Sequence, residues 1–145
     1  MRLYVAVLNE FPDYMTPTLV AHSMLGAHLQ FSFKDSQGVS EYPEYYNWMG
    51  NSFRKCVLRV NQKEFDKISA LPNCYLGHEN NTLEGRKSCA IPLPYERQED
   101  IPNVLKYAKL WKPSNVSVEK ELAAWKEHFD DGDIMWDGED LVWVN

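Results

Sequence analysis

The sequence predicts an α/β fold with a mixed sheet and helices on both faces. Residues 2–8, RLYVAVL, are β-branched or apolar on both sides of the chain, which is typical of a central strand that helices cover from two sides. Segments with strand and helix periodicity then follow in the order β, α, β, α, β, β, α, which favours a mixed sheet. A chain of 145 residues is the size of one domain with a single core.

The first half of the chain supplies two strands and two helices. Thr16 is the predicted N-cap of a first helix, because Pro17 follows at the first helical position. A long polar connection comes next, with a short helix expected at 44–49. Residues 53–61, FRKCVLRVN, alternate in polarity and predict a second strand. Residues 62–71 place apolar side chains three positions apart, which predicts a short helix that ends at the following proline.

The second half is expected to add two strands, a helix and a C-terminal extension. Residues 73–81 predict a third strand that turns at Gly77, and residues 87–94 a fourth that its prolines break. Residues 96–111 carry a helical apolar pattern. The character of the chain then changes, so we divide it into a body at 1–112 and an acidic extension at 113–145. The extension predicts a helix with one apolar stripe and a hairpin near Asp137-Gly138, packed on the body.

Charge is unevenly distributed along the chain. The formal net charge is −6, but from residue 127 onward there are seven acids and no Lys or Arg. Residues 1–126 carry 15 basic and 14 acidic side chains, so the charge of this part of the chain does not argue against a nucleic-acid partner. No apolar run approaches the roughly 18 residues that span a bilayer, and the N-terminus does not resemble a signal peptide. We therefore expect a cytoplasmic protein without a membrane partner.

Two places concentrate residues that could carry chemistry. His22 shares a predicted helix face with Leu19, Leu25 and Leu29, where it is either a core-edge histidine or part of a site. The segment 76–88, LGHENNTLEGRKS, holds more polar groups than a plain hairpin needs, although a solvated loop is an equal alternative. The four histidines and three cysteines lack metal-ligand spacing, and no glycine-rich phosphate loop is present. We predict neither a metal nor a cofactor.

Two stretches together resemble the type-two peptidyl-tRNA hydrolase family. LVAHSMLGA, residues 19–27, is similar to the helix-one signature of that family, in which a histidine is followed three residues later by Gly-Ala. Residues 78–111 resemble the family's Asp-Ala-Gly-Arg-Thr-Gln segment with its following strand, turn and final helix. The resemblance implies a three-layer sandwich with a small mixed four-stranded sheet. It also implies hydrolysis of the ester that joins a peptidyl or acyl group to tRNA, without a cofactor.

The resemblance assigns roles to seven residues of the chain. His22 and Thr82 match the signature histidine and threonine, while His78 stands where the family has its aspartate, so all three are catalytic candidates. Asn81 stands at the family's arginine and Asp13 at one of its lysines. Ester hydrolysis needs a base for water, for which His22 and His78 are candidates, and a donor for the oxyanion, for which Asn80, Asn81 and Arg86 are candidates. Asp13 is expected to face the substrate at the lysine position but cannot supply the positive charge of a lysine.

The loss of the family's lysines and aspartate leaves a second function open. The chain is either a divergent hydrolase or a catalytically degenerate binding or regulatory protein that uses the same cleft. The expected ligand is tRNA or a nucleotide in the first case, and a nucleotide, RNA or protein in the second. The acidic C-terminal segment, with its tryptophans, is an additional candidate surface for a protein partner.

Overall fold

The structure, a computed structural model, describes residues 1–79, 85–113, 134–136 and 141–143. The backbone divides into two units, Met1–Lys112 and Pro113–Asn145, which are described separately. In the described part of the chain, no helix is both long and apolar enough to cross a membrane.

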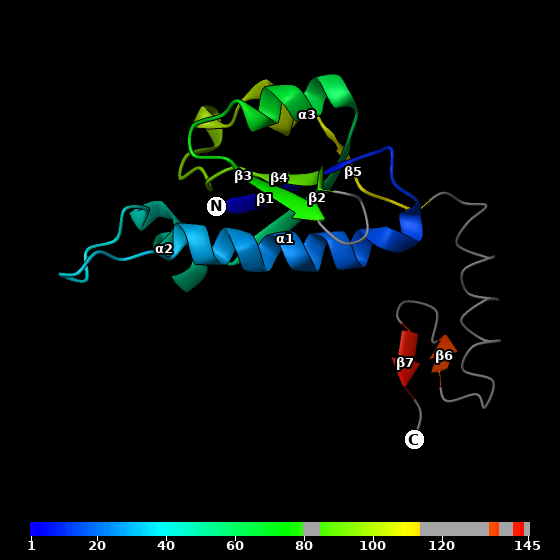
Figure 1. Cartoon of the computed structure of the whole chain (residues 1–145), viewed down its shortest axis with the longest axis horizontal. Coiled ribbons are helices and arrows are strands. Elements are labelled where there is room, and N and C mark those ends of the chain that lie inside the picture. Colours follow the sequence, from blue (N-terminus) through cyan, green and yellow to red (C-terminus); the bar gives the residue numbers. More distant parts are fainter. Residues whose placement is uncertain (80–84, 114–133, 137–140, 144–145) are drawn as a thin grey trace. The chain divides into compact units, whose positions relative to one another are not determined.

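Five strands form one open mixed sheet in the first unit, in the order β3-β4-β1-β2-β5 (Figure 1). β1 (Arg2–Leu8) lies at its centre, parallel to β2 (Arg54–Val60) and antiparallel to β4 (Arg86–Ile91). β3 (Tyr75–Glu79) and β5 (Lys109–Leu110) pair antiparallel with β4 and β2. Every residue of β1 after Arg2 is buried, as expected for a strand covered on both faces. The predicted α/β class with a mixed sheet is confirmed.

The sheet has five strands, whereas the resemblance implied four. The fifth comes from residues 96–111, which the sequence predicted as one helix and in which only η2 (Gln98–Asp100) and α4 (Asn103–Lys106) are helical. The two residues of β5 pair with Leu58 and Arg59, and the N–H of Trp111 donates to the carbonyl of Val57 at 2.9 Å. Without β5, the edge of β2 would expose unpaired backbone groups, so sheet hydrogen bonds outweigh the helical pattern.

Helices pack on both faces of this sheet. α1 (Thr16–Phe31) lies against one face and α3 (Gln62–Ser69) against the other (Figure 1). α4 packs beside α3, and the short helix expected at 44–49 is present as α2 (Pro43–Gly50). The chain enters α1 through η1 (Asp13–Met15), which makes Met15 the N-cap position. The prediction of Thr16 as N-cap was therefore wrong by one residue, because Thr16 is already helical and buried.

The buried face of α1 differs from the one that the sequence predicted. Leu25 and Leu29, expected in the core, are 70% and 75% exposed. The helix instead buries a stripe of mostly smaller residues, namely Thr16, Leu19, Ser23, Ala27 and Phe31. The reason is a close approach to β3: a Cβ on Gly77 would lie 2.0 Å from Oγ of Ser23. Gly77 is thus a packing position within β3 and not the turn that the sequence predicted.

The described residues of the second unit are two short strands. β6 (Ile134–Trp136) and β7 (Leu141–Trp143) pair antiparallel, with Ile134 opposite Trp143. The turn predicted near residues 137–138 and the helix predicted within 117–129 lie outside the described residues.

Candidate functional site

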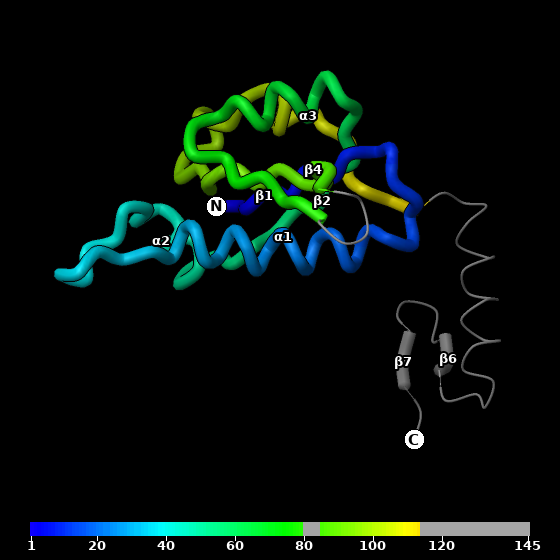
Figure 2. The backbone as a smooth tube through the Cα atoms, viewed as in Figure 1, coloured from blue at the N-terminus to red at the C-terminus, as the bar shows by residue number. Residues whose placement is uncertain are grey.

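Most of the predicted site segments lie where the parallel strands of the sheet finish, a side of the sheet that we call its carboxyl-terminal edge. The parallel strands β1 and β2 end there at Leu8 and Val60, and β3 ends there at Glu79, because it runs parallel to β1 through β4. Figure 2 traces the chain from the end of β1 into the start of α1 at this same edge. In open α/β sheets, the edge at which parallel strands end is the usual place for a ligand. The described candidates from these segments are Asp13, His22, His78 and Arg86.

His22 faces a carboxylate that the sequence prediction did not assign. Its Nδ1 lies 4.0 Å from Oε1 of Glu79. The Glu79 side chain is only 12% exposed, and Oε1 has no hydrogen-bond partner among the described residues. The His22 side chain is 56% exposed and is open to solvent. A separation of 4.0 Å is too long for a direct hydrogen bond, so a small rotation or one bridging water is needed to join the two groups.

The close packing of α1 on β3 explains why these two side chains meet. Ser23, the residue after His22, packs directly against Gly77. Glu79 lies two residues beyond Gly77, and alternate residues of a strand point to the same face. Glu79 is therefore directed toward α1 at the turn that carries His22. The glycine and the serine together set the distance between the imidazole and the carboxylate.

A small cavity adjoins this pair. Its volume is about 240 Å³, and its lining comes from the entry to α1 and the end of β3: Tyr14, Met15, Thr18, Leu19 and Glu79. Glu79 supplies its carboxylate, whereas Met15 and Leu19 make its wall largely apolar. A buried carboxylate, an exposed imidazole and an apolar cavity are together the elements needed to orient a histidine base beside a bound apolar group.

The other described candidates lie at this edge but do not join His22. Nδ1 of His78 lies 3.3 Å from the carbonyl of Gly85. Arg86 forms an ion pair with Glu10 and stacks over the ring of Phe11. Within the described residues, neither His78 nor Arg86 forms a hydrogen bond or ion pair with His22. Thr82, Asn80 and Asn81 lie outside the described residues, so their predicted roles stay predictions.

Asp13 belongs to a second ion pair at the same edge. Its Oδ1 lies 3.0 Å from Nη2 of Arg59, which also donates to the carbonyl of Lys112 at 2.8 Å. The guanidinium of Arg59 also stacks over the ring of Trp111. Two arginines at this edge, Arg59 and Arg86, are thus neutralised by neighbouring carboxylates. The local excess of positive charge is consequently small.

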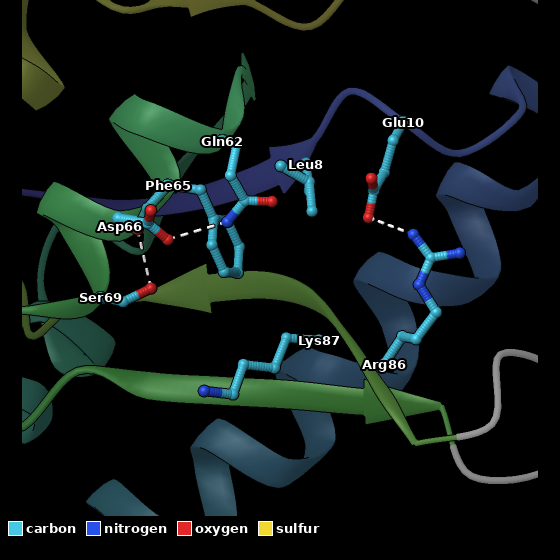
Figure 3. A pocket seen from close by; sticks show the side chains of 8 residues that line it. All are labelled: Leu8, Glu10, Gln62, Phe65, Asp66, Ser69, Arg86 and Lys87. Atoms are coloured by element: carbon cyan, nitrogen blue, oxygen red, sulfur yellow. Dashed lines mark hydrogen bonds and ion pairs between the residues drawn. The ribbon is translucent and has the colours of Figure 1, made fainter.

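A second cavity of about 320 Å³ lies on the α3 face of the same edge (Figure 3). Leu8 and Phe65 give it an apolar wall, and the Glu10–Arg86 ion pair closes one side. Gln62, Asp66 and Ser69 contribute polar groups from α3, but Nε2 of Gln62 already donates to Asp66 at 2.8 Å. Lys87 also lines this cavity and has no ion-pair partner among the described residues, so only part of the polar lining is paired.

A buried polar cluster lies where α1 meets β4 and consists of Ser23, Ser88 and Cys89. All three are fully buried, and neither hydroxyl has a partner at hydrogen-bond distance among the described residues. Burial raises the pKa of the Cys89 thiol, and the nearby charge of Glu79 raises it further. Burial likewise raises the pKa of Cys74, to about 12. Both thiols are therefore protonated at neutral pH and are poor nucleophiles.

No cluster of three or more His, Cys, Asp or Glu side chains suited to a metal occurs within the described ranges. The residue that sequence reasoning missed is Glu79, because the predicted turn at Gly77 hid that the strand continues to Glu79. Comparison with known protein families found no matching family, and a search of curated proteins found no match.

Proposed function

We propose that the protein hydrolyses the ester between a peptidyl or acyl group and tRNA, as the family resemblance implies. The observation that carries this proposal is the His22–Glu79 pair, in which Glu79 also lines a largely apolar cavity. The mixed sheet with helices on both faces is compatible with the three-layer sandwich of that family. The position of the imidazole on the first helix after β1 also agrees with the signature histidine.

In this mechanism His22 is the general base and Glu79 orients it. The carboxylate of Glu79 accepts a hydrogen bond from the protonated Nδ1 of His22, and this leaves Nε2 free to take a proton from water. The water oxygen then bonds to the ester carbonyl carbon, and the bond from that carbon to the ribose oxygen breaks. The proton on His22 passes to the departing ribose oxygen, which leaves as a hydroxyl, and the new carboxylic acid of the peptide releases its own proton to solvent and leaves as a carboxylate. The negative charge of Glu79 stabilises the imidazolium that exists between these steps.

The cavity lined by Met15, Thr18 and Leu19 supplies a place for the acyl side chain. Burying an apolar group there contributes about 25 cal/mol for each Å² removed from water, which favours acyl groups with aliphatic or aromatic side chains. Tyr14 and Thr18 are the described residues of this cavity whose hydroxyl groups could donate to the oxyanion. Thr82, Asn80 and Asn81 remain further proposed donors.

The test is the release of an N-acylated aminoacyl group from tRNA by the full chain. His22→Ala should lower the rate by about 10²–10⁴-fold, the usual contribution of a general base. Glu79→Gln should lower it as well, because the neutral amide cannot stabilise an imidazolium. His28→Ala is the matched control, since His28 lies on the same helix and instead contacts the hydroxyl of Tyr45 at 2.9 Å.

A second function is supported by the two ion pairs at this edge. Affinity for RNA depends on cations that meet phosphates, and Arg59 and Arg86 are already paired with Asp13 and Glu10. These contacts weaken the affinity expected for tRNA and so favour a catalytically degenerate binding or regulatory protein; of its possible ligands, a nucleotide, RNA or protein, they favour a protein. Ester release that is absent in the wild type, or equal in the wild type and His22→Ala, would exclude the hydrolase and leave this alternative.

A further inference from the structure

Two arginines stand side by side at the edge of the sheet opposite to His22. Arg2 and Arg54 are partners at the first positions of the parallel strands β1 and β2. Neighbouring strands lie about 4.8 Å apart, and partners across a strand pair direct their side chains to the same face. Within the described residues, neither guanidinium has an ion-pair or hydrogen-bond partner, in contrast to Arg59 and Arg86.

Both arginines line one cleft of about 350 Å³. Tyr4, Tyr95 and Gln98 also line it and add two hydroxyl groups and an amide. Burial raises the pKa of the Tyr95 hydroxyl, with a further contribution from Cys74, so it remains a hydrogen-bond donor at neutral pH. The cleft contains one carboxylate, Glu96, whose Oε1 accepts a hydrogen bond from Nδ2 of Asn47 at 3.5 Å.

The two guanidinium groups are the main charged feature of this cleft. Two guanidinium groups on adjacent strands repel each other, and a doubly charged oxyanion between them turns that repulsion into two attractive contacts. The planar fork of arginine matches the oxygens of a phosphate, and neutral hydroxyl and amide donors can bind its remaining oxygens. We propose that the cleft binds a phosphate group of a small phosphate monoester, held between Arg2 and Arg54.

The size of the cleft favours an ester over the bare ion. Volumes of about 300–1,000 Å³ are typical of sites for small organic ligands. Ile101 and the rings of Tyr4 and Tyr95 give part of the lining an apolar character, which suits the organic part of the ligand. This inference does not rest on the proposed hydrolase, because it uses residues from the other end of β1 and β2.

The experiment is isothermal titration of the full chain at low ionic strength. The probes are a nucleoside 5′-monophosphate, the same nucleoside without phosphate, inorganic phosphate, and a short RNA without terminal phosphates. We expect the monophosphate to bind and the nucleoside not to bind. Arg2→Gln combined with Arg54→Gln should weaken binding of the monophosphate by at least about tenfold, since each lost contact is a charge-assisted hydrogen bond.

The matched control is Lys63→Gln combined with Lys67→Gln, which removes two exposed positive charges from α3 and should leave the affinity unchanged. Inorganic phosphate binding as tightly as the ester, with the same dependence on Arg2 and Arg54, would support the anion site and assign it to free phosphate. Failure of the monophosphate and the inorganic ion to bind would overturn the proposal, as would binding of the RNA alone or equal affinity in the double variant. Circular dichroism checks that each variant is folded.

Discussion

The contact between Gly77 and Ser23 offers a direct test of how α1 is held on the sheet. A Cβ added at Gly77 would lie 2.0 Å from Oγ and 2.9 Å from Cβ of Ser23. The hydroxyl could rotate away, but the Cβ atom of Ser23 moves only with the helix. Because favourable contacts between carbon atoms begin at about 3.5 Å, Gly77→Ala requires α1 and β3 to separate by about 0.6 Å at this point.

Overpacking of this kind typically costs about 1–3 kcal/mol, and we expect Gly77→Ala to lower the free energy of unfolding by that amount. Urea unfolding followed by circular dichroism measures the change. Combining Gly77→Ala with Ser23→Gly removes both close atoms, so the double variant should be at least about 1 kcal/mol more stable than the sum of the single effects. Gly50→Ala is the control, because no atom lies within 4 Å of a Cβ placed there.

Two results would refute this reasoning. A change below about 0.5 kcal/mol for Gly77→Ala would mean that α1 adapts without cost. Strict additivity in the double variant would mean that the destabilisation arises elsewhere than at Ser23. The same separation of α1 from β3 moves His22 away from Glu79, so the proposed hydrolysis should fall in Gly77→Ala even under conditions where the variant is fully folded.

Two further predictions concern stability. Asn61 caps α3, because its Oδ1 accepts a hydrogen bond from the N–H of Glu64 at 2.8 Å. Asn61→Ala should therefore lower the free energy of unfolding by about 0.5–2 kcal/mol, whereas Asn61→Asp should not. Urea unfolding of both variants measures the change. Burial raises the pKa of Cys74 from 9.0 to about 12, so the folded chain holds this proton more tightly than the unfolded chain. The contribution of Cys74 to stability should therefore be constant below about pH 9 and be lost between there and pH 12. Unfolding in urea at increasing pH tests this, and Cys74→Ala should show a shallower fall; an equal fall in both would contradict the assignment.

The strands were predictable where burial imposes a simple pattern. Residues 2–8 are apolar on both sides because helices cover both faces of β1, and the sequence shows this directly. β5 was missed because it is only two residues long and follows an apolar helical pattern. Its formation depends on the unpaired edge of β2, which is known only once the sheet is assembled.

The face of α1 illustrates a different limit. Leucines at positions 25 and 29 predict burial by hydrophobicity, yet both are exposed. The close approach at Gly77 and at Gly26, where a Cβ would meet the Tyr75 hydroxyl at 1.8 Å, admits only small side chains toward β3. A helix that packs this tightly selects its buried face by volume as well as by hydrophobicity. His22 consequently lies beside the buried stripe and is exposed, which does not fit a core-edge histidine, whereas its assignment to a site stays a prediction.

In the candidate site, the family resemblance assigned a role to His78 but none to its neighbour Glu79. The two residues point to opposite faces of β3, so a shift of one position exchanges an exposed histidine for a largely buried carboxylate. Strand alternation from Gly77 would have selected Glu79. Thr82, Asn80 and Asn81 lie outside the described residues, so the proposed donors among them rest on the sequence alone.

The proposed phosphate cleft and the proposed hydrolase site lie at opposite ends of β1 and β2. A strand of seven residues spans about 20 Å, which exceeds the screening length of about 8–10 Å at physiological ionic strength. The charges of Arg2 and Arg54 therefore exert little electrostatic effect on His22, and a small phosphate bound between them should leave ester hydrolysis unchanged. Only an RNA long enough to cross the sheet could link the two edges. In that case, loss of Arg2 and Arg54 would raise the KM for acylated tRNA without lowering kcat, because the contact would be equally strong in the ground state and the transition state.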